Sequence, residues 1–254
     1  MRLRVLGCSG GIAANCLTTS YLVNDNILLD GGTGVGELSL DEMSLIKHVF
    51  LTHTHLDHIA GLALMLASIY EQAASRITVY APESVLNVLE KHLFNWEIWP
   101  DFTQLPNSED SILSFQTLCV DEPCLVDDFK VQTVLLSHTV ESFAYILKSG
   151  HSSLCFCGDT GPTETLWNEL NKLNELQYLI VEVSYPNEQL DLAVQSGHHT
   201  PQTLFNDIKR LTHDTKICVH HMKPGNESII INQCETLFSS NVLKILEQGD
   251  MLDV

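Results

Sequence analysis

The sequence predicts an α/β protein, and three observations support this fold class. Short strand-like runs alternate with amphipathic helical runs along the chain. Histidine and acidic side chains recur directly after the strand-like runs, where a rigid sheet can direct them into one shared cleft. The length of 254 residues suits one large domain or two small ones and can bury a substantial core.

The expected elements follow one another along the chain. Four helical runs are expected at residues 58–70, 82–94, 163–173 and 201–211. Pro82 and Pro201 begin two of them, where a missing N–H costs little. Many short strands with interspersed helices favour α/β or α+β architectures in which helices cover packed sheets. The strand-like runs lie at residues 3–7, 19–23, 26–32, 48–52, 76–80, 129–138, 143–147, 153–159, 178–183, 216–221 and 243–254.

The net charge argues against one large class of substrates. With 13 basic and 32 acidic residues, the chain carries a formal charge of −19 and has no Lys/Arg cluster. A nucleic acid polymer is therefore not expected as a partner, although bound metal cations could still hold a small anion. No apolar stretch reaches the roughly 18 residues of a membrane span, and the N-terminus lacks a secretory apolar segment. We expect a cytoplasmic protein without membrane attachment.

The eight cysteines have irregular spacings, which indicate reduced thiols and not a disulfide framework. Cys155 and Cys157 do not have the C-x2-C spacing of a zinc ribbon. Their alternation predicts two strand residues that face the same side and pack in the core.

Residues 53–58 read HTHLDH, which places three imidazoles and a carboxylate within six positions. His53 and His55 are expected on one side of an extended turn, and Asp57 and His58 open the following helix. A carboxylate at a helix N-terminus also suits the helix dipole, which explains Asp57 alone. It does not explain three histidines, so the motif predicts half of a metal site.

A site for two divalent ions needs about seven protein ligands and a bridging water. The motif supplies four, and His138, Asp159 and His221 follow later strand-like runs. A carboxylate between two cations is electrostatically favourable, and Asp159 in GDTG is the best candidate for that position. Alone, His138 or Asp159 would be a weak prediction; their order after the motif strengthens both.

The segments THTHLDH, SHT, CGDTG and VHHMKP, in this order, resemble the metallo-β-lactamase superfamily of dinuclear hydrolases. The resemblance covers nearly the whole chain and implies one domain over 1–254, an αββα sandwich of two packed mixed sheets flanked by helices. The segment HMKP favours His221 over its neighbour His220, which would face the other side of the strand. The implied ligands are His53, His55 and His138 for the first metal, Asp57, His58 and His221 for the second, and Asp159 as the bridge.

In phosphodiesterase branches of this superfamily, a strand glutamate pairs with a histidine that protonates the leaving oxygen. Glu182 and His198 stand in that order, and a positioned general acid accelerates such a reaction about 10²–10⁴-fold. The carboxylate would keep the imidazole protonated and oriented. His199 is the rival for this role, and GHHTP could instead be a turn in which Thr200 caps the next helix.

The segments HLDHIAGL, HLFNWEIWPDFTQLP, VEVSYPN, GHHTP and HMKP are together similar to class II cyclic-nucleotide phosphodiesterases. The resemblance implies hydrolysis of 3′,5′-cyclic AMP or GMP to the 5′-monophosphate by a metal-bridged hydroxide. Two divalent ions would be bound, with zinc favoured and iron or manganese allowed. Asp57 would also help align or deprotonate the water. Trp96, Trp99 and Phe102 form either a packed hydrophobic flap or an aromatic wall for a purine.

The sequence alone leaves several other functions open. A tRNA 3′-end endonuclease would use the same ligand order and Glu–His pair, but the net charge and the lack of an evident basic tRNA-clamping arm argue against it. Hydrolysis of 2′,3′-cyclic or alkyl phosphodiesters is harder to exclude. A glyoxalase II type thioester hydrolase would share the metals without requiring the Glu–His pair. A non-catalytic metal-dependent binding protein is the least favoured. The oligomeric state is left open, a homodimer included.

Overall fold

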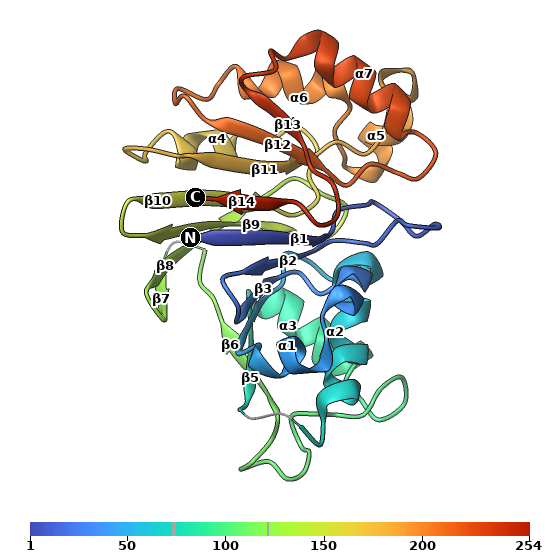
Figure 1. Cartoon of the computed structure of the whole chain (residues 1–254), viewed down its shortest axis with the longest axis vertical. Coiled ribbons are helices and arrows are strands. Elements are labelled where there is room, and N and C mark those ends of the chain that lie inside the picture. Colours follow the sequence, from blue (N-terminus) through green and yellow to red (C-terminus); the bar gives the residue numbers. More distant parts are fainter. Residues whose placement is uncertain (73–74, 121) are drawn as a thin grey trace.

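The structure is a computed structural model that describes residues 1–72, 75–120 and 122–254. Within these residues, fourteen strands form two mixed sheets of seven strands each. The two sheets pack face to face, and helices cover both outer faces (Figure 1). The expected αββα sandwich of two mixed sheets is therefore confirmed.

The first sheet has the order β14-β1-β2-β3-β4-β5-β6. Its strands pair antiparallel from β14 to β3 and parallel from β3 to β6. The strands are β1 (Arg2–Gly7), β2 (Ser20–Val23), β3 (Ile27–Leu29), β4 (His48–Phe50), β5 (Ile77–Ala81), β6 (Leu113–Thr117) and β14 (Met251–Asp253).

The second sheet has the order β13-β12-β11-β10-β9-β8-β7. Its strands pair parallel from β13 to β10 and antiparallel from β10 to β7. The strands are β7 (Cys124–Val126), β8 (Phe129–Leu135), β9 (Phe143–Ser149), β10 (Ser152–Cys157), β11 (Tyr178–Glu182), β12 (Lys216–His220) and β13 (Leu243–Ile245).

The helices divide between the two outer faces, with α1 to α3 beside the first sheet and α4 to α7 beside the second (Figure 1). Two short 3₁₀ helices, η1 (Thr33–Glu37) and η2 (Asn187–Gln189), lie in connecting segments. The α-helices are α1 (Leu40–Leu45), α2 (Leu56–Ile69), α3 (Glu83–His92), α4 (Thr165–Leu170), α5 (Leu190–Ser196), α6 (Pro201–Ile208) and α7 (Glu227–Leu237).

Three hydrophobic clusters hold these layers together. One lies between the first sheet and its helices, one between the second sheet and its helices, and one between the two sheets. Alternation along each strand sends successive side chains to opposite faces, so one strand supplies two clusters. Cys155 and Cys157 both face the helix side of β10 and are fully buried, as their spacing predicts. All eight cysteines are free thiols.

The strands bring the predicted site residues to one edge of the sandwich. β8, β10, β11 and β12 run in the same direction, because β8 and β10 are both antiparallel to β9. His138, Asp159 and His221 follow β8, β10 and β12, and Glu182 ends β11. The first sheet supplies His53 from the segment after β4. The site therefore lies where strand ends from both sheets meet.

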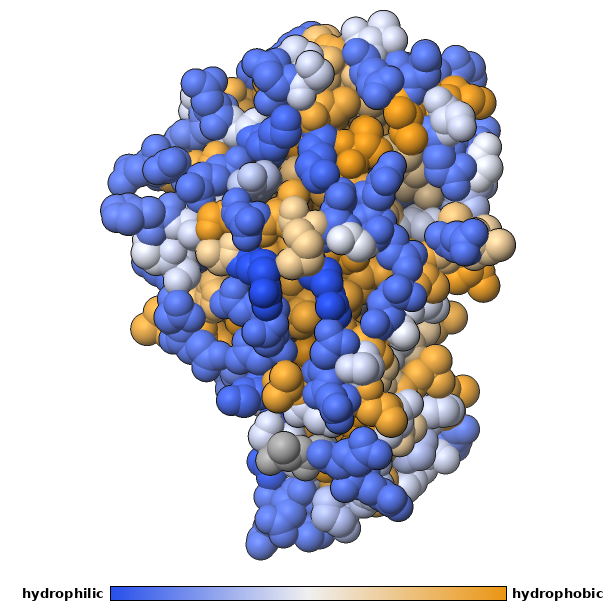
Figure 2. Space-filling view, viewed as in Figure 1, coloured by the Kyte–Doolittle hydropathy of each residue, from blue (hydrophilic) through white to orange (hydrophobic). Residues whose placement is uncertain are grey.

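Some elements differ from the sequence expectation. The run at 243–254, expected as one strand-like segment, is two strands in different sheets, and the chain turns between them at Gly249 with φ of 90°. The expectation omitted β6, β7, α1, α5 and α7. On the face shown in Figure 2, hydrophilic side chains surround smaller hydrophobic areas. None of the helices in the described ranges has the length and apolar character that crossing a bilayer requires.

Candidate metal centre

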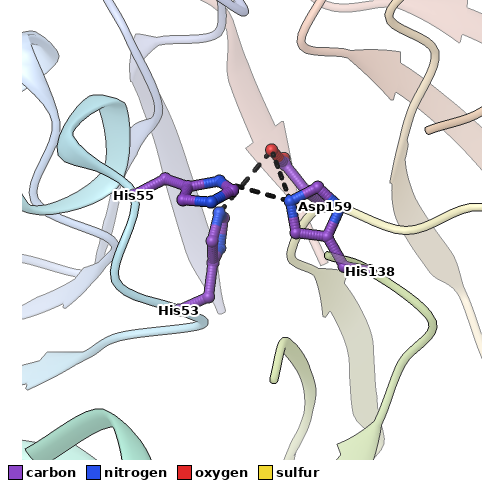
Figure 3. Close-up of side chains that lie close together, drawn as sticks. All are labelled: His53, His55, His138 and Asp159. Atoms are coloured by element: carbon purple, nitrogen blue, oxygen red, sulfur yellow. Dashed lines mark hydrogen bonds and ion pairs between the residues drawn. The ribbon is translucent and has the colours of Figure 1, made fainter. Parts of the chain in front are cut away.

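The first group of candidate ligands consists of His53, His55, His138 and Asp159, whose donor atoms all lie within 4.8 Å of one another (Figure 3). His138 Nε2 is 3.2 Å from His55 Nδ1. Asp159 Oδ2 lies 3.6 Å from His53 Nε2 and 3.9 Å from His138 Nε2. Three nitrogens and one carboxylate oxygen thus converge on a space of the size that one metal ion fills.

The second group shares the same aspartate. Asp57, His58, Asp159 and His221 also have donor atoms within 4.8 Å of one another. Here the other carboxylate oxygen, Asp159 Oδ1, lies 3.2 Å from His221 Nε2 and 3.3 Å from His58 Nε2. Asp57 Oδ2 is 3.4 Å from His221 Nε2. Asp159 therefore turns one oxygen toward each group, which is the geometry of a bridging carboxylate.

The outer nitrogens of four histidines contact oxygen atoms of the surrounding protein. His138 Nδ1 donates to the carbonyl of Gly197 at 2.8 Å, and His58 Nδ1 lies 2.7 Å from Asp30 Oδ2. His53 Nδ1 lies 3.0 Å from the hydroxyl of Thr52, and His221 Nδ1 lies 3.0 Å from that of Ser184. Contacts of this kind fix the ring orientation and leave the other nitrogen with its lone pair directed inward.

The nitrogen and oxygen atoms that these side chains direct into the site are suited to metal cations. In the neutral form that binds a metal, His58 and His221 present Nε2 lone pairs to each other at 3.2 Å. Two lone pairs at that distance repel each other unless a cation lies against both. His53 Nε2 and Asp159 Oδ1 are buried and have no hydrogen-bond partner among the described residues. This donor set therefore fits divalent metal ions.

Burial and mutual charge shift the pKa values of these groups. Burial lowers the pKa of His53 well below its usual value and also lowers those of His55 and His138, which favours neutral imidazoles. Burial alone would raise the pKa of Asp159, but the neighbouring His221, His58 and His53 hold it well below its usual range. Burial also opposes the charged form of His58, but Asp159 and Asp30 outweigh it and raise the pKa of this imidazole well above its usual value. The centre thus combines an ionised Asp159 carboxylate with three imidazoles, those of His53, His55 and His138, that favour the neutral form.

A second pair lies beside this centre. His198 Nδ1 is 2.5 Å from Glu182 Oε1 and 4.0 Å from Asp159 Oδ2. Glu182 is fully buried, and its carboxylate also accepts bonds from the Thr160 N–H at 3.0 Å and the Ser184 hydroxyl at 2.7 Å. Burial opposes the charged form of His198, but Glu182 outweighs it and raises the pKa of the imidazole. The pair is therefore arranged to hold a proton on His198.

His199 and His220, which are next to His198 and His221 in the chain, point away from the metal centre. His199 is buried and contacts the hydroxyl of Thr203 at 3.0 Å, at the N-terminus of α6 that Thr200 caps. His220 is buried on the side of β12 that faces the other sheet, where its ring packs edge-on against Tyr21 with centroids 5.6 Å apart. The expected opposite orientation of His220 and His221 is confirmed.

One glycine shapes this edge of the site. Gly197 ends α5 in the left-handed conformation, with φ of 68°. A Cβ built there would lie 3.0 Å from His138 Nδ1 and 3.1 Å from His138 Cα. Because glycine has no Cβ, the chain can make this turn while its carbonyl approaches His138. The turn also places His198 next to the centre.

The aromatic segment after α3 divides between two environments. Phe102 is buried in the cluster beneath the first sheet, and the half-buried Trp99 donates its indole N–H to the carbonyl of Ala63 at 2.8 Å. Trp96 has a positive φ of 66° and is 60% exposed. Phe102 and Trp99 therefore form the packed part of the flap, and the ring of Trp96 is exposed to solvent.

Two residues of the site were missed by the sequence analysis. Asp30 follows β3, is fully buried with φ of 58°, and contacts His58. Ser184 lies two positions after Glu182 and contacts both His198 and His221. The segment LLDGG gave a partial signal for Asp30, because an aspartate that ends a strand-like run before two glycines suits a turn, and aspartate adopts the left-handed region more readily than most residues. This pattern does not identify the contact with His58. No comparable signal marked Ser184.

Relatives with two different names align with this chain. A Yersinia pestis protein named "Probable 3′,5′-cyclic-nucleotide phosphodiesterase" is 28% identical over 305 aligned residues, which cover 96% of this chain and 87% of that protein. A Prochlorococcus marinus protein named "Ribonuclease Z" is 22% identical over 306 aligned residues and covers 96% of both chains. Each of these two relatives therefore aligns over nearly the full length of the chain.

The fold agrees with these relatives. The crystal structure of unliganded yeast PDE1 superposes with a TM-score of 0.84 at 21% sequence identity, covering 100% of this chain and 99% of that one. Residues 40–241 match a protein-family model that is described as the class-II cAMP phosphodiesterases. On this match, the chain belongs to the class-II cAMP phosphodiesterase family.

Proposed function

We propose that this protein is a metal-dependent phosphodiesterase that hydrolyses nucleoside 3′,5′-cyclic phosphates, such as cyclic AMP or GMP, to 5′-monophosphates. The observation that carries the proposal is the position of the Glu182–His198 pair, which lies within 4.0 Å of the shared Asp159. A dinuclear site next to a proton donor suits a phosphodiester with a basic alkoxide leaving group. Family membership supports the same substrate class.

We assign the seven candidate ligands to two ions. The nitrogen-rich donor set favours zinc, although iron and manganese use the same ligand types. Two such ions lower the pKa of bound water and neutralise phosphate charge. The first ion is assigned to His53, His55, His138 and Asp159, and the second to Asp57, His58, His221 and Asp159.

His198 is assigned as the general acid that protonates the departing 3′-oxygen. Its Nδ1 is held by Glu182, so Nε2 is the nitrogen from which a proton can pass to the substrate. Glu182 stabilises the charged imidazole and fixes its orientation. His199 is less suited to this role, because its side chain contacts the cap of α6. Asp57, at the first turn of α2, is assigned to the alignment of the attacking water as well as to metal binding.

We place the nucleobase against Trp96, whose exposed ring offers a stacking surface. The substrate is thus a small molecule, and no nucleic acid polymer is included as a partner. The net charge of −19 disfavours a long phosphate backbone. We place the enzyme in the cytoplasm, where a reducing environment suits its free cysteines.

Endonucleolytic processing of tRNA 3′ ends is the second candidate, because a relative named Ribonuclease Z aligns over 96% of the chain. The two candidates share the metal centre and differ in the size and charge of the substrate. The net charge favours the small substrate.

Product-resolved hydrolysis by metal-loaded protein tests the proposal. The substrates are 3′,5′-cyclic AMP, 3′,5′-cyclic GMP, 2′,3′-cyclic AMP, bis(p-nitrophenyl) phosphate and a precursor tRNA. Chelator-sensitive conversion of a 3′,5′-cyclic nucleotide to its 5′-monophosphate is the expected result. Cleavage confined to the precursor tRNA or to the 2′,3′-cyclic compound would overturn the proposed substrate and retain the metal centre.

A further inference from the structure

We propose that Ser184 is a positioning residue whose hydroxyl couples the metal ligand His221 to the Glu182–His198 pair. This inference rests on the proposed function, because it concerns the general acid assigned there. Ser184 lies in the segment after β11 and is fully buried. Among the described residues, Ser184 has the one hydroxyl that contacts both His221 and the Glu182–His198 pair.

The backbone holds Ser184 in place from two sides. Its N–H donates to the carbonyl of His199 at 3.1 Å, and its carbonyl accepts from the N–H of Lys223, also at 3.1 Å. The first bond ties it to the segment that carries His198, and the second ties it to the segment just after His221. The hydroxyl therefore has a defined position between the two histidines.

The Ser184 hydroxyl has one hydrogen and four neighbours. Oγ lies 2.7 Å from Glu182 Oε2, 3.0 Å from His221 Nδ1, 3.2 Å from His198 Nδ1 and 3.2 Å from the carbonyl of His221. The carboxylate is the nearest neighbour, carries charge and can only accept. The hydrogen is therefore donated to Glu182, and the serine oxygen is left as an acceptor.

This direction fixes the tautomer of His221. With the serine oxygen as acceptor, His221 Nδ1 carries the hydrogen and donates it to Ser184. The lone pair of His221 is then on Nε2, which lies 3.2 Å from Asp159 Oδ1 and 3.4 Å from Asp57 Oδ2. Ser184 thus selects the form of His221 that can bind a metal ion.

The same bond completes the shell around Glu182. The carboxylate accepts from Ser184 at Oε2, and from His198 and the Thr160 N–H at Oε1. Since Glu182 is fully buried, these donors replace the water that an ionised carboxylate requires. Loss of the Ser184 hydroxyl would leave Oε2 without its donor and His221 Nδ1 without its acceptor. One substitution should therefore disturb metal binding and leaving-group protonation together.

The test compares Ser184→Ala and Ser184→Cys, which lose the strong hydrogen bond, with Ser184→Thr, which keeps a hydroxyl. Ser142→Ala is the matched control, because that serine is also fully buried but its hydroxyl has no hydrogen-bond partner among the described residues. The first readout is zinc affinity by chelator competition. We expect a loss of about 10–100-fold in the Ala and Cys variants, rescue by Thr, and no change in the control.

The second readout is the ¹⁵N NMR shift of the histidine ring nitrogens in the zinc-loaded protein. We expect the Nδ1–H form of His221 in the wild type and a mixture of tautomers in Ser184→Ala. The third readout compares two substrates. Hydrolysis of a 3′,5′-cyclic nucleotide, whose alkoxide must be protonated, should fall at least 10-fold more than that of bis(p-nitrophenyl) phosphate, whose leaving group departs without a proton.

Unchanged zinc affinity and unchanged His221 tautomer in Ser184→Ala would overturn the inference. Equal losses on the two substrates would do the same, because a purely structural defect lowers both. If wild-type protein does not hydrolyse cyclic nucleotides, the proposed substrate fails, and the zinc and NMR readouts still decide the role of Ser184. If the wild type hydrolyses them and Ser184→Ala matches it in every readout, the coupling alone fails.

Discussion

Asp30 Oδ2 lies 2.7 Å from His58 Nδ1, so a buried carboxylate stands directly behind a candidate metal ligand. The same carboxylate accepts from the N–H and the hydroxyl of Thr52, both at 2.8 Å. Burial raises the pKa of Asp30, although His58 partly offsets that effect. Asp30 thus ties His58 of α2 to the strand end that precedes His53.

Asp30→Asn should weaken both folding and metal binding. An amide can accept from His58 or from Thr52 but cannot satisfy all three donors, so a buried polar group is left unpaired. We expect a loss of about 1–3 kcal/mol in the free energy of unfolding of the metal-free protein. Metal affinity should fall about 10–100-fold. Urea unfolding and chelator competition measure the two effects.

Asp25→Asn is the control for this prediction. Asp25 pairs with Arg2 at the surface, and its side chain is 69% exposed. Such pairs contribute little to stability. If Asp30→Asn behaves like the control, the carboxylate does not position His58.

His198→Gln should reduce turnover of the cyclic nucleotide by about 10²–10⁴-fold while both metals are retained. Glutamine removes the proton donor, whereas none of the assigned ligands is altered. Steady-state kinetics and elemental analysis of the same preparation measure the two quantities. His151→Gln, at an exposed histidine between β9 and β10, should match the wild type. Loss of metal in His198→Gln would show that the imidazole is a ligand and not the acid.

Asp159→Ala should lose at least one metal ion, because each oxygen of Asp159 faces one ligand group. We expect two equivalents in the wild type and one or none in the variant, measured by elemental analysis after gel filtration. Asp207→Asn is the matched control. Asp207 is also buried, but it accepts from Thr163 and Trp167 among the helices of the second sheet. That variant should lose stability and keep both metals. Full occupancy in Asp159→Ala would exclude the bridging role.

The stability of the protein should fall with rising alkaline pH. Burial raises the pKa of the thiols of Cys8, Cys218 and Cys234 to about 12 in the folded chain. Below the ordinary thiol pKa, these groups are protonated in both states and contribute no pH dependence. Above it, the unfolded chain ionises while the folded chain does not, so stability is lost between about pH 9 and pH 12.

Urea unfolding at pH 7.5, 9 and 10 measures this dependence. Each unit of pKa difference corresponds to about 1.4 kcal/mol, so one thiol contributes a measurable slope. Cys234→Ala, which removes one buried thiol from the inner face of α7, should give a shallower decline than the wild type. Parallel pH curves for the two proteins would contradict the prediction.

Strong local patterns predicted most of the sheet framework. The runs that became β2, β9 and β11 are rich in apolar residues, since these strands are largely buried on both faces. The omitted strands β6 and β7 are the end strands of their sheets and are partly exposed, so they lack such a pattern. In α7, the run Ile229–Ile231 favours a strand by its β-branched side chains, and only packing over the second sheet decides for a helix.

The residues of the candidate site differ in how well the sequence alone predicts them. The motif at 53–58 is local and needs no tertiary information. His138, Asp159 and His221 were found by their order along the chain and by the family resemblance, since their spacing alone is not diagnostic. Asp30 and Ser184 act through hydrogen bonds to residues 28 and 37 positions away. Asp30 contacts His58 only after α2 has packed beside β3, and Ser184 contacts His221 only after β11 and β12 have paired. A local sequence pattern therefore does not reveal these contacts.

The order of the ligands along the chain bears on how the enzyme acquires its metals. During synthesis, the motif at 53–58 leaves the ribosome long before His221, whose strand must still pair with β11. A nascent chain therefore offers four clustered donors without the aspartate that joins the two groups. Because Asp159 and His221 follow β10 and β12, both proposed ions could be held together only after these strands have formed. The ions available in the cell at that moment then select the metal as much as the intrinsic affinity of the ligands does.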